Sequence, residues 1–393
     1  MSGFVKNRGG TRQPNGTYRG GSWTAYWYEV VNGQRKQRSK GGFETKRAAT
    51  EYLTEVLASI QSHAYVTPSR TTLASYLLET WLPAQEQRLR RSTFADYRRR
   101  IDQHIVPALG HVQLQELDGR HLDRLYATLL ATGGHEGRPL SPKTVRNVHV
   151  VLRKALADAT RKRYVTRNVA LDADPPKVPG PGEREMAVWT PEELRTFLDG
   201  ISQHRLAAAY VLAASTGMRR GEVLGVRWSD LDLDAGTVSI RHTIVSVEYE
   251  VQVSEPKTAR GRRTISLDAA TVAVLLWHRQ AQERERLERQ SGEQIDDQDL
   301  VFCRADGRPI HPDYFSQTFD RTVARLKLRR VRLHDLRHTY ATLALRAGVD
   351  AKTVSARLGH ATVAFTLDVY TKAVPQLDRE AADKIAGLIF GDE

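Results

Sequence analysis

Six residues in the second half of the chain have side chains that suit chemistry on a phosphodiester. In sequence order they are Arg219 (TGMRRGE), Lys257 (EPKTARG), His334 and Arg337 (both in LHDLRHTY), His360 (LGH) and Tyr370 (LDVYTK). The HxxR spacing puts two side chains about one helical turn apart on one face, so His334 and Arg337 can contact the same ligand. Arg219 follows Thr216 and Gly217, where a helix is expected to begin and where backbone N–H groups favour an anion. A phosphate is therefore the ligand that these residues suit best.

Each of these residues also has an ordinary structural interpretation. Tyr370 could be a half-buried helix tyrosine, His360 could cap a helix, and the two arginines could pair with carboxylates. For the whole ordered set, a chance match is about one in fifty or less. The order and local sequence of the six, more than any single residue, carry the prediction.

A rival enzyme class uses a metal ion. His334, Asp335 and His338 could be metal ligands, because histidines four apart on a helix share a face, and the protein would then be a metal-dependent phosphodiesterase. That hypothesis gives no role to Arg219, Lys257 or Tyr370. Sensitivity to EDTA would distinguish the two.

The chain resembles the tyrosine recombinases over about residues 188–375, on the motifs TGxRxxE, a hairpin lysine, HxLRH, LGH and a late tyrosine. Glu222 matches the family's acidic residue one turn after the first arginine, and the resemblance implies that it orients the site without reacting. The step of ten residues from His360 to Tyr370 resembles integrases of Gram-positive phages and integrative elements. The catalytic set implied by the resemblance is Arg219, Lys257, His334, Arg337, His360 and Tyr370.

The resemblance also implies a reaction. Tyr370 would attack the phosphodiester and form a 3′-phosphotyrosine, which conserves the bond energy, so that a free 5′-hydroxyl can rejoin the strand without ATP. The two arginines would bind the phosphate oxygens, and Lys257 would protonate the departing 5′-oxygen. His334 would accept or donate a proton near the nucleophile, and His360 would donate a hydrogen bond to the phosphate. No metal and no cofactor is expected.

Two further functions share parts of this pattern. A topoisomerase-like enzyme that nicks and closes one duplex would use much of the same pocket. A DNA-binding regulator with an inactive site would bind DNA and form no covalent complex.

The composition agrees with a nucleic-acid partner. The 393 residues include 59 Lys+Arg and 46 Asp+Glu, which gives a net charge of +13 and a pI near 9.8. Cations that neutralise phosphates release counterions, although a merely basic protein or a membrane-surface binder would show the same excess. No run approaches the ~18 apolar residues of a spanning helix, and the first residues lack a secretion signal. We therefore expect a cytoplasmic protein, in which the single Cys303 serves packing.

The expected fold is mainly α with small β-sheets (α+β), in three domains. Residues 1–65 are expected to contain a hairpin around Asn32-Gly33 and a helix from Thr45 to about Gln61. This segment resembles the arm-type DNA-binding domain of integrases, so the resemblance implies an arm-type DNA-binding module. Residues 66–171 have helical periodicity, with Ser92 and Ser141 at expected N-caps. This segment resembles the core-binding (SAM-like) domain of the same family, which the resemblance therefore implies. A linker rich in proline and glycine occupies residues 172–187.

The catalytic domain is expected over residues 188–393, with mixed α and β elements. Thr190, Pro191 and Glu193 form a capping-box signature that begins its first helix, and strands are expected within residues 234–253 and 262–267. After Tyr370, the segment from Gln376 to Phe390 places apolar residues on one helical face. This tail could pack on its own domain or on a neighbouring subunit.

Basic residues in the first two domains are candidates for DNA contact, with a solvated charged surface as the alternative. They are Lys36, Arg38, Lys40, Arg98, Arg99, Lys143, Arg146 and Arg153. The resemblance implies double-stranded DNA as the partner, at core and arm attachment sites, and a homotetramer on that DNA. An excisionase or a host DNA-bending protein is a candidate further partner, and no membrane is expected.

Overall fold

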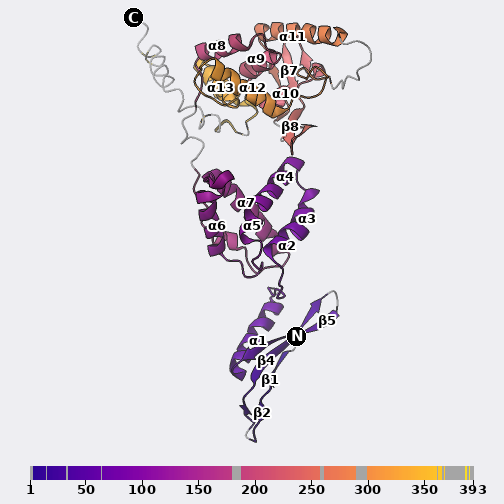
Figure 1. Cartoon of the computed structure of the whole chain (residues 1–393), viewed down its shortest axis with the longest axis vertical. Coiled ribbons are helices and arrows are strands. Elements are labelled where there is room, and N and C mark those ends of the chain that lie inside the picture. The colour runs from indigo at the N-terminus through magenta and orange to yellow at the C-terminus, as the bar shows by residue number, and fades with distance from the viewer. Residues whose placement is uncertain are drawn as a thin grey trace. The chain divides into compact units, whose positions relative to one another are not determined.

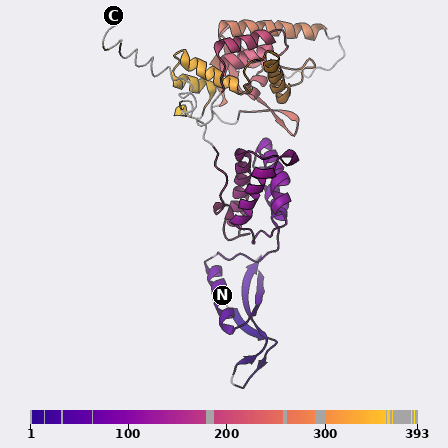
Figure 2. The same cartoon turned by 60° about the vertical axis from the view of Figure 1, so that its left-hand side comes forward.

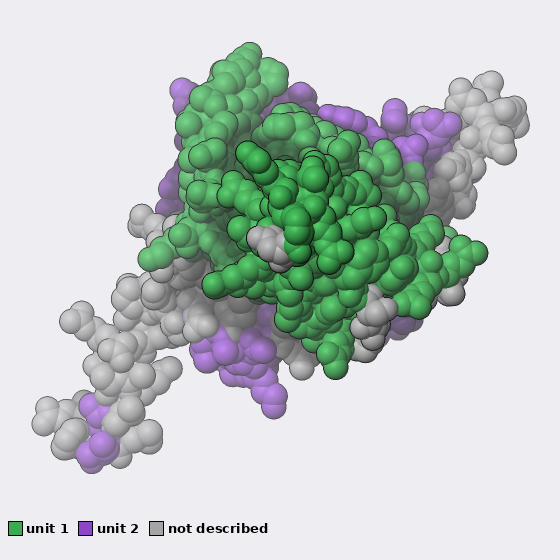
Figure 3. All heavy atoms as spheres, turned by 90° about the horizontal axis from the view of Figure 1, so that it is seen from below, with its two compact units in different colours: residues 1–178 green, residues 179–393 purple. Residues whose placement is uncertain are grey.

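The computed structural model describes residues 3–14, 16–31, 34–62, 64–178, 187–256, 261–288, 299–360, 362–364, 367, 386 and 389. Lys257, Tyr370 and nearly all of the predicted tail helix therefore lie outside the described residues. The chain divides into two compact units, residues 1–178 and 179–393, which Figure 3 shows in different colours. Among the described helices, none combines the length and apolar character needed to cross a bilayer.

The first unit begins with a small sheet and a helix. The helix α1 packs on the antiparallel sheet of order β1-β4-β5 (Figures 1 and 2). Val31 of β4 pairs with Gln34 of β5, so the predicted antiparallel pairing is confirmed, whereas Asn32 and Gly33 themselves lie outside the described residues. The Thr45 hydroxyl caps α1 as expected. These elements are β1 (Gly3–Arg8), β2 (Thr11–Arg12), β3 (Tyr18–Arg19), β4 (Ser22–Val31), β5 (Gln34–Phe43) and α1 (Lys46–Gln61).

Two features of this sheet were not predicted. The strand β1 lies in a segment for which no strand was predicted, and it pairs with β4 along its length. Residues 24–27 of β4 are all buried, whereas a strand with one face in solvent buries only alternate residues. The reason is that β4 is the central strand: Trp27 packs toward α1, while Tyr26 on the other face stacks on Phe4 and lies under Arg8.

The rest of the first unit is a bundle of helices around a core of its own (Figure 2). Two of its helices contain π-helical turns that run into Pro83 and Pro107, whose rings lack the N–H of a regular helix. The elements are α2 (Leu73–Ser75), η1 (Tyr76–Trp81), α3 (Leu82–Glu86), α4 (Arg91–Arg100), η2 (Ile101–Ile105), α5 (Val106–Leu109), α6 (Gly119–Thr132), η3 (His135–Gly137), α7 (Pro142–Arg161) and η4 (Val169–Leu171).

One of the two predicted caps in this bundle is wrong. Ser141 does cap α7, since its hydroxyl accepts the Thr144 N–H at 3.2 Å. Ser92, in contrast, is the second residue of α4 and caps nothing. The Arg90 carbonyl already accepts the first N–H bonds of that helix, so it begins two positions earlier, without a side-chain cap.

The second unit combines helices with two small antiparallel sheets, of order β10-β7-β6 and β8-β9. The predicted capping box is confirmed: the Thr190 hydroxyl accepts the Glu193 N–H, and the Glu193 carboxylate accepts the Thr190 N–H. The elements are α8 (Pro191–Ile201), α9 (Ala207–Thr216), α10 (Arg220–Leu224), η5 (Trp228–Asp230), β6 (Leu231–Asp232), β7 (Thr237–Ile240), β8 (Thr243–Val247), β9 (Glu250–Ser254), β10 (Arg263–Ser266), α11 (Ala269–Glu288), α12 (Pro312–Arg325), α13 (Asp335–Arg346) and α14 (Ala351–Leu358).

The helix α9 is the core element of this unit. Nearly all of its residues are buried, and Tyr210 stacks on Phe315 of α12 with ring centroids 4.3 Å apart. Helices α8, α10, α11 and α13 all contact α9. Because α9 is held on all sides, the residues that follow its last turn have a fixed starting point.

Candidate active site

Arg219 lies in the short connection between α9 and α10. The helix α9 ends at Gly217, whose left-handed backbone (φ 67°) turns the chain, and Arg219 is the residue that precedes α10. One carboxylate fixes it twice: Glu222 accepts the Arg219 backbone N–H at 3.0 Å and its Nη1 at 2.7 Å. The Arg219 side chain is still 43% exposed, so its cationic end reaches the surface.

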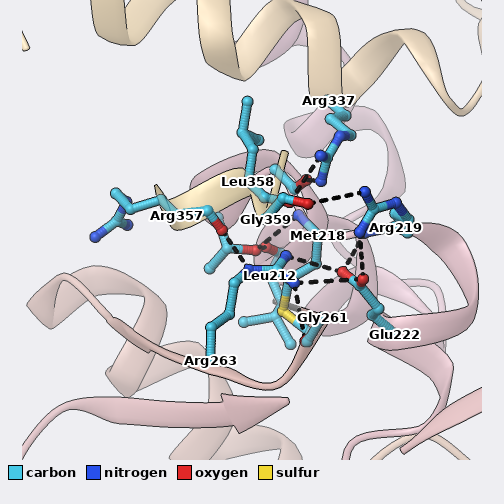
Figure 4. A network of polar contacts seen from close by, with 12 residues as sticks. Leu212, Met218, Arg219, Glu222, Gly261, Arg263, Arg337, Arg357, Leu358 and Gly359 are labelled. Atoms are coloured by element: carbon cyan, nitrogen blue, oxygen red, sulfur yellow. Dashed lines mark hydrogen bonds and ion pairs between the residues drawn. The ribbon is translucent and has the colours of Figure 1, made fainter. Parts of the chain in front are cut away.

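Glu222 itself is buried between two arginines. Arg263 Nη2 donates to its Oε2 at 2.9 Å, opposite the Arg219 contact (Figure 4). Burial would raise the pKa of the Glu222 carboxyl, but the hydrogen bonds and charges of Arg263 and Arg219 outweigh it and hold that pKa below its usual value. Glu222 is thus an ionised carboxylate at neutral pH.

Arg337 is buried in the first turn of α13, with 3% of its surface exposed. Its Nη1 donates to the Gly217 carbonyl at 2.8 Å, and its Nη2 donates to the Leu358 carbonyl at 2.7 Å. Two bonds to fixed backbone oxygens set the plane of this guanidinium.

The C-terminal end of α14 brings these segments together. Leu358 accepts from Arg337, and the next carbonyl, of Gly359, accepts from Arg219 Nη2 at 3.3 Å (Figure 4). Gly359 adopts a left-handed backbone (φ 67°), and the N–H of His360 then bonds back to the Ser355 carbonyl at 3.1 Å. Both arginines therefore meet one short turn that ends at a predicted site histidine.

Three histidines border this group and share one electrostatic environment. Partial desolvation, with Arg337 and Arg219 as the next causes, lowers the pKa of His360 to about 3. Desolvation and the neighbouring His334 lower the pKa of His338 to about 4, and His334, whose ring reaches solvent, also has a lowered pKa from desolvation and Arg337. Each of these shifts favours the neutral form of the imidazole at pH 7.

Four of the six predicted catalytic residues are thus described, and two useful neighbours were missed. Arg263 lies in the strand that was predicted within residues 262–267, and no role in the site was assigned to it. His338 was considered only as a metal ligand, although it lies one turn from His334 with ring centroids 5.3 Å apart. Asp335, the third member of that metal hypothesis, accepts hydrogen bonds from the backbone and guanidinium of Arg332.

The predicted DNA-contacting residues all lie on the surface. Those of the first module are on β5, and those of the helical bundle are on α4 and α7. Arg38 also bonds to Glu29 at 2.6 Å and Arg99 to Asp96 at 2.7 Å, so these two are partly neutralised within the protein. The Lys40 ammonium lies 4.3 Å from the centre of the Tyr52 ring.

Three protein-family models match successive parts of the chain. The arm DNA-binding domain matches residues 17–60, the phage integrase N-terminal SAM-like domain matches residues 74–130, and the phage integrase family matches residues 188–376. Among characterised relatives, a XerC-like tyrosine recombinase of Caldanaerobacter subterraneus is 27% identical, over 88% of this chain and 91% of its own. The ICEBs1 integrase of Bacillus subtilis is 26% identical, over 93% of this chain and 96% of its own.

Solved structures share the fold. The Tn1549 transposon integrase bound to a circular intermediate DNA aligns with a TM-score of 0.62 at 19% identity, covering 80% of this chain and all of that one. A lambda integrase tetramer bound to a Holliday junction aligns with a TM-score of 0.58 at 16% identity, covering 88% and 92%.

Together, the fold and the matches define a tyrosine-type site-specific recombinase that binds DNA. The chain belongs to the phage integrase family, with relatives that serve phages and integrative elements.

Proposed function

We propose that this recombinase cuts each DNA strand with Tyr370 and holds the scissile phosphate with Arg219 and Arg337. The observation that carries the proposal is the meeting of both guanidinium groups at the adjacent carbonyls of Leu358 and Gly359, beside His360. These residues come from three separate stretches of the chain, and a shared phosphate is the ligand that two fixed guanidinium groups suit best.

The reaction exchanges one phosphoester for another. The Tyr370 oxygen attacks phosphorus, a bond forms between them, and the bond to the 5′-oxygen breaks. The transition state carries added negative charge on the phosphate oxygens, which the two arginines stabilise because they are held in place beforehand. The departing 5′-oxygen takes a proton, and we assign its donor to Lys257.

Neutral histidines complete the proposed site. A neutral imidazole can accept the Tyr370 proton through one nitrogen or donate a hydrogen bond through the other, and we assign the first role to His334 and the second to His360. A phosphate in the pocket would add negative charge beside these rings and so raise the pKa of each.

The proposed domain division follows the expected boundaries, with an arm-binding module at 1–65, a core-binding domain at 66–171, a linker at 172–187 and a catalytic domain at 188–393. Exposed cations on β5, α4 and α7 support DNA contact by the first two. We propose a homotetramer on core sites, with arm sites bound separately, in line with the tetramer of lambda integrase on a Holliday junction. An excisionase or a host DNA-bending protein would set direction. Because its substrate is cellular DNA, we place the protein in the cytoplasm.

The test is covalent trapping on a suicide duplex that loses a short strand on cleavage. We expect a 3′-adduct on denaturing gels, with the DNA mapped to Tyr370 by mass spectrometry, and equal yield in EDTA. Loss of cleavage in EDTA would favour the metal alternative. An adduct without strand exchange between two sites would favour the topoisomerase alternative, and absence of any adduct would favour an inactive regulator.

A further inference from the structure

Arg263, the first residue of β10, contacts three of the segments that build the site. Its Nη2 donates to Glu222 of α10, and its Nε donates to the Arg357 carbonyl of α14 at 2.5 Å. Its Nη1 donates to the Gly261 carbonyl at 3.3 Å, four residues after Lys257 in the sequence. One guanidinium thus links α10, which begins directly after Arg219, α14, which ends before His360, and β10, which follows Lys257 in the sequence (Figure 4).

The charges of this group do not cancel. Two arginines share one carboxylate, with Arg219 at 2.7 Å and Arg263 at 2.9 Å from its two oxygens. The Glu222 and Arg263 side chains are only 5% and 9% exposed, whereas Arg219 is 43% exposed. The buried pair neutralises itself, and the net positive charge is left on the exposed partner. Without Arg263, the only arginine contacting Glu222 in the described structure would be Arg219, and their charges would cancel.

We propose that Arg263 is a positioning residue for strand cleavage. Its charge compensates that of Glu222, which leaves the positive charge of Arg219 available to the scissile phosphate. Its bond to the Arg357 carbonyl holds the end of α14, whose Gly359 carbonyl orients Arg219. This inference rests on the proposed role of Arg219. Arg263 itself does not touch the reacting atoms.

A bond pattern of the same kind occurs away from the site and supplies a matched control. Arg205 donates its Nε to the Cys303 carbonyl at 3.0 Å and its Nη1 to the Glu285 carboxylate at 2.6 Å. Losing the Arg205 side chain removes one carbonyl bond and one carboxylate pair, whereas losing Arg263 removes two carbonyl bonds and one carboxylate pair, so the control is matched in the kinds of bond lost. The described contacts of Glu285 include none with a proposed catalytic residue.

The experiment compares Arg263→Gln, Arg205→Gln and the double variant Arg263→Gln/Glu222→Gln in the full chain. Single-turnover formation of the covalent adduct is measured at saturating DNA, and DNA affinity is measured separately by fluorescence anisotropy. We expect Arg263→Gln to slow cleavage by roughly tenfold to a hundredfold with little change in affinity, because a catalytic group displaced by about 1 Å loses rate on that scale. Arg205→Gln should keep the wild-type rate.

The double variant separates charge from mere support. The double variant has no Glu222 carboxylate to cancel the positive charge of Arg219. It should therefore cleave faster than Arg263→Gln alone. Arg263→Lys keeps the charge but not the fork of donors, so its rate should lie between those of the wild type and Arg263→Gln. Should the glutamine variant fail to fold, Arg263→Lys alone is compared with the wild type, with slower cleavage per folded molecule expected.

Three results would overturn the proposal. They are an Arg263→Gln rate equal to that of Arg205→Gln, a double variant no faster than Arg263→Gln, and an Arg263→Lys rate that only follows its folded fraction. If the wild-type protein forms no adduct, the proposed function fails and not this inference.

Discussion

At the scale of single residues, the two proposed phosphate-binding arginines differ in what holds them. Arg337 is almost wholly buried, and its hydrogen bonds to the Gly217 and Leu358 carbonyls connect the end of α9 with the end of α14. Arg219 is partly exposed and is held by its ion pair with Glu222. Both are oriented before DNA arrives, which lowers the reorganisation that the transition state requires. Their loss should therefore slow cleavage in both cases but affect stability differently.

We expect Arg219→Ala and Arg337→Ala each to reduce cleavage by roughly a hundredfold or more, with smaller changes in DNA affinity. Arg337→Ala should also lower the free energy of unfolding by about 2 kcal/mol or more, because buried carbonyls lose charged donors. Single-turnover cleavage, DNA binding and chemical denaturation measure the three quantities. The control is Arg220→Ala, whose guanidinium bonds to Pro312, Asp313 and Ser316. If the two variants lose only affinity, the arginines are ordinary phosphate clamps.

Acid should destabilise the catalytic unit through its histidines. The pKa of His360 is about 3 in the folded protein and near 6.5 in the unfolded chain. At any pH between these two values the unfolded chain binds more protons than the folded protein. The free energy of unfolding therefore falls as the pH drops below about 6.5. Thermal unfolding at pH 7, 6 and 5 should show this loss, with a shallower slope for His360→Asn. His111→Asn, in the helical bundle, serves as the control. Equal slopes in His360→Asn and the wild type would contradict the account.

At the scale of elements, two helix ends set the geometry of the site. The helices α9 and α14 both end in a left-handed glycine, and the carbonyls of Gly217, Leu358 and Gly359 receive the arginine donors. Glycine adopts this backbone without the steric penalty of a Cβ atom. The site is therefore built as much from backbone turns as from side chains.

Gly217→Ala should damage the site, while Gly348→Ala should not. A Cβ at Gly217 would lie 2.6 Å from both Leu358 Cδ2 and Tyr340 Cδ1, whereas a Cβ at Gly348 would meet nothing within 4 Å. Both glycines have positive φ, so both substitutions cost about 1–2 kcal/mol of backbone strain. Only Gly217→Ala should also slow cleavage, because it displaces the turn that binds the arginines. Equal cleavage by the two variants, measured on folded protein, would show that the α9 end does not position the site.

The elements also show what the sequence could predict. The start of α8 was predictable because its capping box joins Thr190 to Glu193, only three residues apart, with Pro191 between them at the first helical position. Bonds this local can be predicted from a few adjacent residues. Arg263 escaped prediction because its partners Glu222 and Arg357 are 41 and 94 residues away, and only the fold brings them together. The prediction that Ser92 caps α4 was wrong although it rested on a local signal. Serine is a favoured N-cap residue, but α4 already begins at Arg91 with backbone hydrogen bonds to the Arg90 carbonyl.

At the scale of the whole molecule, the first module has a hydrophobic core separate from that of the helical bundle. Ala25, Trp27, Leu53 and Val56 form the buried cluster of the module, and the bundle has its own cluster between residues 73 and 173. Removing the module should therefore leave the second core closed.

Deletion of residues 1–65 should spare cleavage of a simple core site but abolish integration, because the module is proposed to hold arm sites and not the scissile phosphate. Covalent trapping on a core half-site and recombination between full attachment sites measure the two activities. The folded state of the deletion variant is checked by thermal unfolding. If core cleavage is lost in a folded variant, the module contributes to the active site itself.

The central claim is that Tyr370 is the nucleophile, and Tyr370→Phe tests it most directly. This change removes one oxygen, so the variant should bind the core site with wild-type affinity and form no covalent adduct on the suicide duplex. The wild-type protein on the same duplex should give an adduct that carries the DNA on Tyr370. Cleavage that persists in Tyr370→Phe would contradict the account.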